Sequence, residues 1–376
     1  MEPIPYGRQS IDETDVASVV EALRSDWLTT GPRVTEFEAA VSAAAGGHQA
    51  VAVSNGTAAL HTAYAALGIG DGDEVIVPAL TFAATATAAM HLGAKVVFAD
   101  VLDDTGNIDP ESASARVSSA TRAVVGVDYA GHPIDAEDLS ALAQRHGLAF
   151  VEDAAHSIGS TWHGRAVGDL ADATTFSFFP TKNLTTAEGG AVVARDASVA
   201  ARARAFRAHG MVRDAASLRY QNEGPWHQEV QSLGLNYRLP DVLCALGISQ
   251  LARLREFKHA RKAIFDRYVD GLGDVRDLRL PVRKDGADPM WHLFPVRVPA
   301  ERRRDIFEKL RANGILVQVN YIPVYWHPLF EDLGYKRGMC PVAEQYYREE
   351  ISLPMFAGLT PAQQDRVIDA VKDALA

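Results

Sequence analysis

The chain has 376 residues, 47% of them hydrophobic, and carries a formal net charge of -11. A chain of this length can bury one large hydrophobic core and a second, smaller one. The acidic balance, with no basic run beyond the arginines at 302–304, argues against nucleic acid as a partner and gives no reason to expect binding to a membrane surface.

Cys244 and Cys340 lack paired spacing, which excludes a cysteine metal cluster and is typical of a reducing compartment. The opening segment MEPIPYGRQS contains no apolar signal core, and no apolar run of about 18 residues occurs in the chain. We therefore expect a cytoplasmic protein without a membrane segment.

The first predicted element is a helix near the N-terminus. Ser10 and Glu13 have the spacing of a capping box, which predicts that the helix begins there. The apolar residues that follow recur at helical spacing: Val16, Val19, Val20 and Leu23.

From Ala50 onward, short apolar runs alternate with helix-like segments. The runs are 50–53, 74–77, 95–100, 123–127, 148–152 and 174–178. Such alternation predicts an α/β fold with a largely parallel, doubly wound sheet. Ligands of these sheets bind at the carboxyl ends of the strands, so the residues just after each run are candidate site residues.

The exits of the first two runs carry residues that suit a cofactor. Ser54, Asn55, Gly56 and Thr57 form a small-residue turn that opens a helix, where backbone N–H groups and nearby hydroxyls could hold a phosphate. Capping of the helix by Asn55 or Thr57 explains the same turn equally well. Phe82 follows the second run, where its ring could stack on a planar cofactor or pack in the core.

The fifth run ends in two carboxylates, Glu152 and Asp153. Because strand side chains alternate, the two point to opposite faces, and one can face the ligand crevice. A carboxylate beneath a pyridine nitrogen would keep that nitrogen protonated, and a protonated pyridine ring is the electron sink of pyridoxal 5'-phosphate.

Lys182 follows the sixth run, which breaks at Pro180. Burial lowers the pKa of a lysine and makes its amine nucleophilic enough for Schiff-base chemistry. A lysine in a loop is by itself most often a solvated surface residue. Together with the strand-end Asp153, the phosphate turn and Phe82, it predicts a pyridoxal 5'-phosphate site with Lys182 as the covalent anchor.

The last third of the chain predicts a separate small domain of α+β type, so that the large domain spans 1–245 and the small one 246–376. A long helix would carry the chain out of the large domain, with apolar residues on one face: Leu251, Leu254, Phe257, Ile264, Tyr268 and Leu272. Strand-like runs at 292–298 and 315–321 flank a helix that ends at Gly314, and a capping box at Thr360 and Gln363 starts the last helix.

Tyr321, Tyr325 and His327 follow the second of these runs and could line a nucleotide-sugar cleft. Packing in the core or at a dimer contact explains the same aromatic residues equally well. The 12 histidines are scattered and no HExxH motif occurs, so no metal site is expected.

Several segments resemble the sugar aminotransferases of the DegT/DnrJ/EryC1/StrS family, along nearly the whole chain. They are SNGTAAL, PALTFAATATA, GNIDPE, VEDAAHSIGS, SFFPTKNLTTAEGGAVV, RAHGM, LGLNYRLPDV and ISLP. Within the family the chain is most similar to the 4-aminotransferases of UDP-4-keto-6-deoxy-hexosamines, above all that of the pseudaminic acid pathway. That second resemblance is carried by VDYAG at 127–131, TTAEGGAVV and ILVQVNYIPVY at 315–325.

The resemblance implies fold type I of the pyridoxal-phosphate enzymes and a role for each matching residue. Lys182 would form the Schiff base, Asp153 would pair with the pyridine nitrogen, and Phe82 would stack on the ring. His156, where many members have glutamine, would lie near the 3'-oxygen. The phosphate would be held by Gly56, Thr57 and Ser177. The resemblance also implies a homodimer, in which Asn236 of the neighbouring subunit would reach the same phosphate.

Asn236 has an ordinary alternative role, which is to cap the helix predicted to begin near Pro240. The chain departs from the family at two further positions that bear on the substrate pocket. Phe179 replaces a histidine that many members have, and Asn320 precedes Tyr321 where others have His-Tyr.

The family activity implied is transfer of an amino group from L-glutamate to a nucleotide-linked keto-sugar, here at C4 of a UDP-4-keto-6-deoxy-N-acetylhexosamine. The alternatives are a 3-aminotransferase for a dTDP-linked keto-sugar and a pyridoxal-phosphate sugar dehydratase. Dehydratase relatives typically have histidine at the lysine position, so Lys182 argues against the dehydratase. A regulator without turnover would need a fused DNA-binding segment or a lost lysine, and the sequence contains neither.

Overall fold

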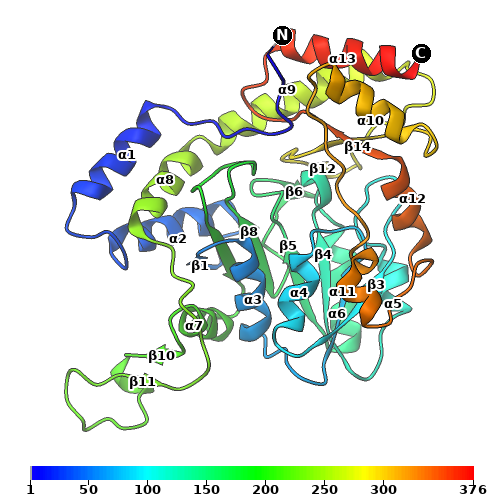
Figure 1. Cartoon of the computed structure of the whole chain (residues 1–376). Coiled ribbons are helices and arrows are strands. Elements are labelled where there is room, and N and C mark those ends of the chain that lie inside the picture. The colour runs from blue at the N-terminus through cyan, green and yellow to red at the C-terminus, as the bar shows by residue number, and fades with distance from the viewer. Residues whose placement is uncertain (1) are drawn as a thin grey trace.

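The computed structural model describes residues 2–376 and has a seven-stranded sheet at its centre (Figure 1). The strands are β1 (Gln49–Val53), β2 (Glu74–Pro78), β3 (Lys95–Ala99), β4 (Thr121–Val127), β5 (Ala149–Asp153), β8 (Ala173–Ser177) and β9 (Gly190–Ala194). Their order is β1-β9-β8-β5-β4-β2-β3. The six predicted runs coincide with β1, β2, β3, β4, β5 and β8 to within two residues at each end, which confirms the α/β fold.

β9 is the antiparallel strand of this sheet, and it pairs with both β1 and β8. The remaining neighbours, from β8 to β3, pair in parallel. The sequence does not predict β9, because its Gly189-Gly190 start is typical of a turn. Gly190 is required by packing, since a Cβ there would lie 2.4 Å from the carbonyl oxygen of Asn55.

Helices cover both faces of the sheet, as a doubly wound fold requires. Along β2, Val75 and Val77 pack in one layer with Tyr64, whereas Ile76 packs in the other layer with Leu139. The helices are α2 (Pro32–Ala44), α3 (Gly56–Ala66), α4 (Ala84–Met90), α5 (Pro110–Ser114), α6 (Ala136–His146) and α7 (Ala197–Phe206).

The N-terminal helix α1 (Glu13–Arg24) has a different cap from the predicted one. Asp12 is the N-cap, and its side chain accepts a hydrogen bond from Asp15 N while Asp15 bonds back to the Asp12 N–H. The predicted Ser10–Glu13 box is wrong, because Asp12 and Asp15 offer the same reciprocal arrangement two residues later. Much of the apolar stripe of α1 is exposed in the single chain: Val16, Val20 and Leu23.

The predicted long helix is two helices, α8 (Asp241–Ala252) and α9 (Leu254–Leu272), which meet at Arg253. The side chain of Arg253 bonds to Asp15 of α1 and to Glu256. The predicted apolar face is correct along α9, whose buried residues include Phe257, Ile264, Tyr268 and Leu272.

The C-terminal third contains a two-stranded sheet of β13 (Phe294–Arg297) and β14 (Glu350–Leu353). The predicted strand 315–321 is wrong: only isolated bridges form there, from Ile315 to Ile4 and from Gln318 to Ser352 of β14. The helices are α10 (Arg303–Ala312), α11 (Pro328–Asp332), α12 (Pro341–Glu349) and α13 (Pro361–Leu375), which has the predicted Thr360–Gln363 capping box.

Two hydrophobic clusters show how this third packs. One joins α9, α10, β13, β14 and α13 and includes Ile4 from the N-terminus. The other places Val324, Phe330 and Tyr346 against β2, β3 and α4 of the large sheet. The segment 324–346 thus packs on the large sheet, and the domain division at 245/246 stays a prediction.

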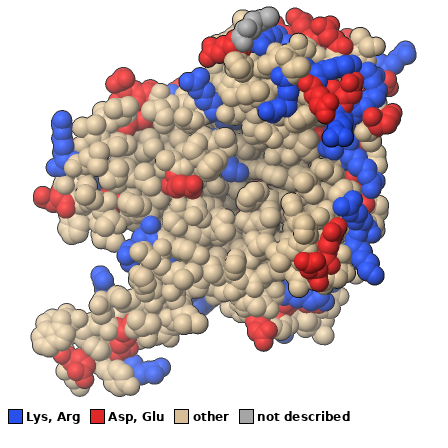
Figure 2. All heavy atoms as spheres, viewed as in Figure 1, with Lys and Arg blue, Asp and Glu red and all other residues tan. Residues whose placement is uncertain are grey.

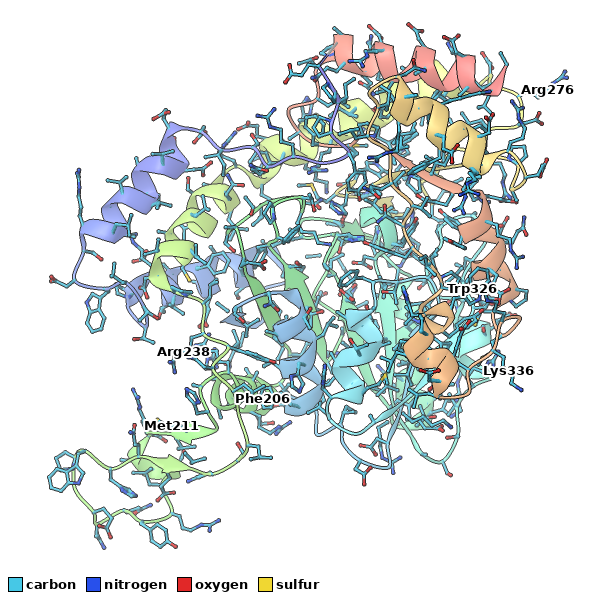
Figure 3. All side chains as sticks on the ribbon, viewed as in Figure 1. Phe206, Met211, Arg238, Arg276, Trp326 and Lys336 are labelled. Carbon is cyan, nitrogen blue, oxygen red and sulfur yellow. The ribbon has the colours of Figure 1, made fainter. Side chains whose placement is uncertain are left out.

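Residues 208–238 form an arm that projects from the body (Figure 1). Its strands β10 (Met211–Val212) and β11 (Glu229–Val230) pair antiparallel, and Figure 3 labels Phe206 and Arg238 at its base. Large apolar side chains on the arm are exposed: Tyr220, Trp226, Val230 and Leu233.

The remaining short elements are β6 (Thr161–Trp162), β7 (Arg165–Ala166), β12 (Ala287–Asp288), η1 (Tyr129–Gly131), η2 (Ala215–Ser217) and η3 (Val324–Trp326).

Candidate active site

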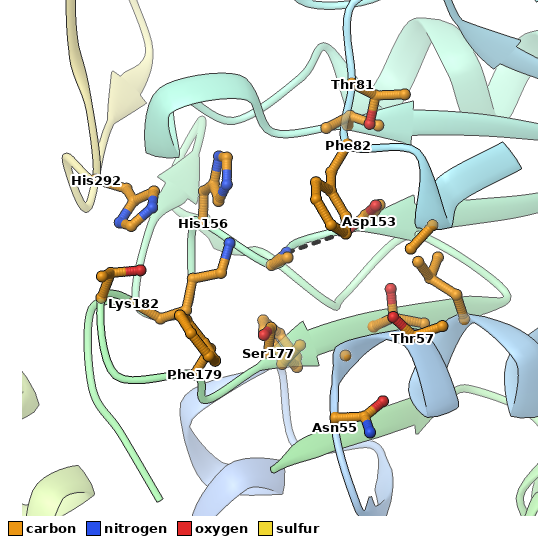
Figure 4. A pocket seen from close by; sticks show the side chains of 18 of the residues that line it. Asn55, Thr57, Thr81, Phe82, Asp153, His156, Ser177, Phe179, Lys182 and His292 are labelled. Atoms are coloured by element: carbon orange, nitrogen blue, oxygen red, sulfur yellow. Dashed lines mark hydrogen bonds between the residues drawn. The ribbon is translucent and has the colours of Figure 1, made fainter. Parts of the chain in front are cut away.

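A cavity of about 680 Å³ lies at the carboxyl ends of β1, β2, β5 and β8 (Figure 4). Figure 2 shows that the centre of this face of the molecule is hollowed and largely uncharged, while Lys, Arg, Asp and Glu side chains gather towards its edges. The predicted site residues that line the cavity are Gly56, Thr57, Phe82, Asp153, His156, Ser177, Lys182 and Tyr321. The structure therefore brings most of the predicted site together.

Lys182 enters the cavity from the turn that follows β8. The backbone N–H of Lys182 donates a 2.9 Å hydrogen bond to Phe179 O, which closes this turn. Burial lowers the pKa of Lys182 to about 8, and the nearby Asp153 carboxylate partly opposes this by raising it. At neutral pH an appreciable fraction of the amine is therefore neutral and nucleophilic.

Asp153 is the last residue of β5 and lines the same cavity. Its carboxylate accepts hydrogen bonds from Thr85 Oγ1 at 2.7 Å and from Ala155 N at 3.2 Å. Burial raises the pKa of Asp153, and the Thr85 bond and the charge of Lys182 lower it in part. A buried carboxylate in this position is best stabilised by a cationic partner.

Glu152 lies on the opposite face of the sheet, as strand alternation predicts. It accepts hydrogen bonds from Gly168 N at 2.9 Å and Thr174 Oγ1 at 3.1 Å, away from the cavity. Of the two adjacent carboxylates, only Asp153 therefore faces the site.

The N-terminus of α3 forms a cradle on one wall of the cavity. The Asn55 side chain caps α3 by accepting a 2.8 Å bond from Ala58 N, so the capping role is confirmed. Capping does not occupy the N–H groups at the very start of the helix, which remain suited to an anion. A Cβ on Gly56 would lie 2.8 Å from Ser177 Cβ, so only glycine lets the turn approach the end of β8 this closely.

Aromatic side chains line part of the cavity. Phe82 is 60% exposed and meets the ring of Tyr321 edge-on at 6.1 Å. The ring of His156 lies tilted beside that of His292, with centroids 4.3 Å apart, and its Nε2 lies 3.2 Å from the Tyr321 hydroxyl. The buried Nδ1 of His156 has no hydrogen-bond partner among the described residues, which leaves it available to a ligand.

Two predicted substrate residues do not reach the cavity. Tyr325 is fully buried, packs against Phe98 at 5.4 Å and donates a 2.6 Å hydrogen bond to Glu344. His327 is the N-cap residue of α11 and lies outside the cavity lining. Neither residue lines the cavity, because the chain turns into η3 after Tyr321 and packs on the large sheet.

Asn236 is exposed on the projecting arm and does not line the cavity of its own chain. It does not cap α8 either, because the N-cap is Pro240 and no side chain caps this helix. The ordinary explanation for Asn236 is therefore wrong.

Sequence reasoning missed Tyr6, His292 and Asn320, which also line the cavity. They come from the N-terminal segment and from the C-terminal third, whereas the strand-exit rule points only to the large sheet. The only sequence signal for Asn320 was that it stands where other family members have the histidine of a His-Tyr pair. Phe179, the other position at which the chain differs from many family members, lines the cavity as well.

Within residues 2–376, no cluster of three or more histidine, cysteine or acidic side chains is arranged to hold a metal ion. No helix in the same range combines the length and apolar character that a membrane span needs.

The profile of the DegT/DnrJ/EryC1/StrS aminotransferase family matches residues 9–372. The chain belongs to this family. The aminotransferase is 39% identical to the spore coat polysaccharide biosynthesis protein SpsC of Bacillus subtilis, over 98% of this chain and 96% of that protein. It is 37% identical to the UDP-4-amino-4,6-dideoxy-N-acetyl-beta-L-altrosamine transaminase of Campylobacter jejuni, over 93% of this chain and 92% of that one.

A solved structure is also similar to this chain over its whole length. Helicobacter pylori PseC, described as an aminotransferase involved in the biosynthesis of pseudoaminic acid, matches with a TM-score of 0.93 at 32% identity, covering 100% of this chain and 99% of that one. The protein is thus a fold type I sugar aminotransferase, and its cofactor is pyridoxal 5'-phosphate. A further structural neighbour, Spr1654 of Streptococcus pneumoniae, was solved in its pyridoxal-phosphate form.

The cavity fits this cofactor by its own chemistry. The α3 cradle with Ser177 suits the phosphate, and the exposed Phe82 offers a face to the ring. Asp153 needs a cation, which a protonated pyridine nitrogen would provide, and the unpartnered Nδ1 of His156 suits a ring oxygen. Lys182 supplies the amine.

Bound pyridoxal 5'-phosphate supplies the electron sink for the carbon that gains or loses the amino group. The chain supplies positioning and proton transfer. Because its pKa is about 8, Lys182 Nζ can accept a proton from that carbon and return it near neutral pH. Thr85 fixes the orientation of Asp153 through its hydrogen bond, and Phe82 lines the same cavity.

Proposed function

We propose that this aminotransferase moves the amino group of L-glutamate to C4 of a UDP-linked 4-keto-6-deoxy-N-acetylhexosamine. The observation that carries the proposal is one cavity in which a low-pKa lysine amine, Lys182, lies with the buried carboxylate Asp153. The similarity to the Campylobacter jejuni transaminase, whose name specifies a UDP-4-amino-4,6-dideoxy sugar, supports the substrate class.

Contacts within the chain also support this substrate. The segments VDYAG and QVNYIPVY, which resemble enzymes for such sugars, touch at the site. The hydroxyl of Tyr129 donates a hydrogen bond to Asn320 O, and Val127, Asn320 and Tyr321 all line the cavity. A volume of about 680 Å³ lies within the usual range for a pocket that holds a cofactor with a small-molecule substrate.

The proposal includes a homodimer with shared active sites, in which Asn236 completes the phosphate site of the neighbouring subunit. Among the described residues, Lys182 is the only lysine or arginine in the cavity lining, which also contains Asp153 and Glu188. A cofactor phosphate and a nucleotide diphosphate therefore need further donors from elsewhere. The projecting arm carries Asn236, and its exposed Trp226 and Leu233 are side chains that a second subunit could cover.

An assay of substrate preference tests the proposal. The enzyme is first converted to its amino form with glutamate, which removes the absorbance of the lysine-bound cofactor, and is then mixed with a panel of keto-sugars. The panel contains 4-keto and 3-keto sugars linked to UDP, dTDP and GDP. We expect the fastest recovery of absorbance with the UDP-linked 4-keto-6-deoxy-N-acetylhexosamine. A preference for a dTDP-linked 3-keto sugar would overturn the proposed substrate.

A further inference from the structure

The N-terminal segment, residues 2–10, is fixed to the body of the protein beside the active site. Ile4 is buried in the core of the C-terminal third. Its N–H donates to Gly314 O at 2.8 Å, and its carbonyl accepts from Leu316 N at 2.9 Å. Two residues later, Tyr6 O accepts a 3.0 Å bond from Met355 N. These bonds hold the backbone on both sides of Pro5 and leave the Tyr6 side chain facing the cavity, which it lines.

The segment then passes the turn that carries the catalytic lysine. A Cβ on Gly7 would lie 3.4 Å from the Cβ of Thr181, the residue before Lys182. Tyr6 therefore lies between the lysine turn on one side and the Asn320–Tyr321 segment on the other, and all of these residues line the same cavity. Neither the cofactor chemistry nor the proton transfer at Lys182 uses Tyr6.

The surroundings of Tyr6 keep its hydroxyl neutral. Burial raises the pKa of Tyr6 well above its ordinary value, Tyr321 and Glu350 raise it further, and Arg261 and Asn320 oppose them. A neutral phenol both donates and accepts hydrogen bonds but offers no positive charge. It therefore suits the hydroxyl or acetamido groups of a sugar better than the carboxylates of glutamate.

Asn320 adds a second polar group at the same place. Its Oδ1 is buried and has no hydrogen-bond partner within the described part of the chain, although the residue lines the cavity. Its backbone is held firmly, because Asn320 N donates a 2.7 Å bond to Glu350 and its carbonyl accepts from Tyr129. A buried acceptor without a partner is costly and indicates a donor group on the ligand.

We propose that Tyr6, held in place by the N-terminal segment, is a substrate-binding residue that binds the keto-sugar together with Asn320. The inference rests on the proposed function and names the residues that would recognise the sugar in it. The sugar's hydroxyl or acetamido group donates to Asn320 Oδ1 and exchanges a hydrogen bond with the Tyr6 hydroxyl. Because these contacts lie away from the reacting carbon, they stabilise the ground state and the transition state alike.

The test separates the two half-reactions of Tyr6→Phe. The first is the reaction of the cofactor-loaded enzyme with glutamate, and the second is the reaction of the amino form with the UDP-linked 4-keto-6-deoxy-N-acetylhexosamine. We expect the glutamate rate to stay within about twofold of wild type. In steady state, the KM for the sugar should rise about tenfold or more with kcat largely kept, as loss of a hydrogen bond used equally in both states predicts.

Tyr347→Phe is the matched control. Tyr347 lies on α12 outside the cavity, where its ring packs edge-on against Trp326 at 5.4 Å, so loss of its hydroxyl should change neither half-reaction. Asn320→Ala should resemble Tyr6→Phe in raising the KM for the sugar and sparing the glutamate reaction.

The outcomes separate the two proposals. If wild type reacts with the sugar and Tyr6→Phe matches it, or loses both half-reactions equally, the role of Tyr6 is overturned and the proposed function stands. If wild-type enzyme in its amino form does not react with the sugar at all, the proposed function fails, and the role of Tyr6 fails with it.

Discussion

The hydroxyl of Thr85 donates a 2.7 Å hydrogen bond to Oδ2 of Asp153, and both residues are buried. Thr85 lies on α4, so the bond ties this helix to the end of β5 at the active site. Because the bond also lowers the pKa of Asp153, it favours the charged form of this carboxylate, which the proposed pairing with the cofactor ring needs.

Thr85→Val keeps the shape of the side chain and removes the donor. We expect kcat to fall on the order of tenfold, because a charge-assisted hydrogen bond is lost while the cofactor stays bound. Steady-state rates with saturating glutamate check this, and Thr87→Val, on the same helix but without a hydrogen bond to Asp153, is the control. Wild-type activity in Thr85→Val would show that Asp153 needs no such support.

The adjacent carboxylates of β5 provide a matched pair of variants. Asp153→Asn should lose activity by on the order of a hundredfold or more, since an amide cannot balance the charge of a protonated ring nitrogen. Glu152→Gln should keep most activity, because its oxygen can still accept from Gly168 and Thr174 on the far face. The comparison is of kcat and of the glutamate half-reaction, and equal losses in both variants would contradict the site assignment.

Capture of pyridoxal 5'-phosphate by the cofactor-free enzyme should depend on pH through Lys182. The neutral amine is the reactive form, so the rate should rise about tenfold per pH unit at low pH and level off near the Lys182 pKa of about 8. Asp153→Asn should move the plateau to lower pH, because the carboxylate raises this pKa. A capture rate that still climbed steeply far above pH 8 would show that Lys182 titrates like an exposed lysine.

Mixed dimers test the shared active site. Lys182→Ala subunits and Asn236→Ala subunits are each expected to be nearly inactive alone. If Asn236 acts on the neighbouring subunit, re-formed mixed dimers should regain up to about half of wild-type activity, since one of two sites is whole. Pairing Asn236→Ala with the double variant Lys182→Ala/Asn236→Ala is the control and should restore nothing. Mixed dimers that form without any gain would rule out the shared site.

The sequence predicts the sheet well because buried parallel strands are continuous apolar runs that end where the chain meets a ligand. That rule is enough to predict that Asp153 and Lys182 share one site, and both line the cavity. It misses β9, whose first residue, Gly190, is required by the close approach of Asn55. Near the N-terminus, Ser10 and Asp12 are both residue types that commonly cap a helix. The observed hydrogen bonds show that Asp12 is the N-cap.

The rest of the site depends on long-range packing that no local pattern encodes. Tyr6 reaches the cavity because Ile4 pairs with Ile315, more than half the chain away, and that pairing cannot be read from either segment alone. Tyr325 lies outside the cavity lining for the same reason. Its apolar neighbours fit a cleft or a core equally well, and contact with Phe98 settles the question.

The central claim is that the enzyme, with Lys182 as its essential amine, moves nitrogen from glutamate to C4 of a UDP-linked keto-sugar. The most direct measurement is nuclear magnetic resonance of the sugar product made with glutamate that carries heavy nitrogen. The account predicts a nitrogen–carbon coupling at C4 with wild type and no labelled product with Lys182→Ala. Label at C3, or label transfer that persists in Lys182→Ala, would contradict it.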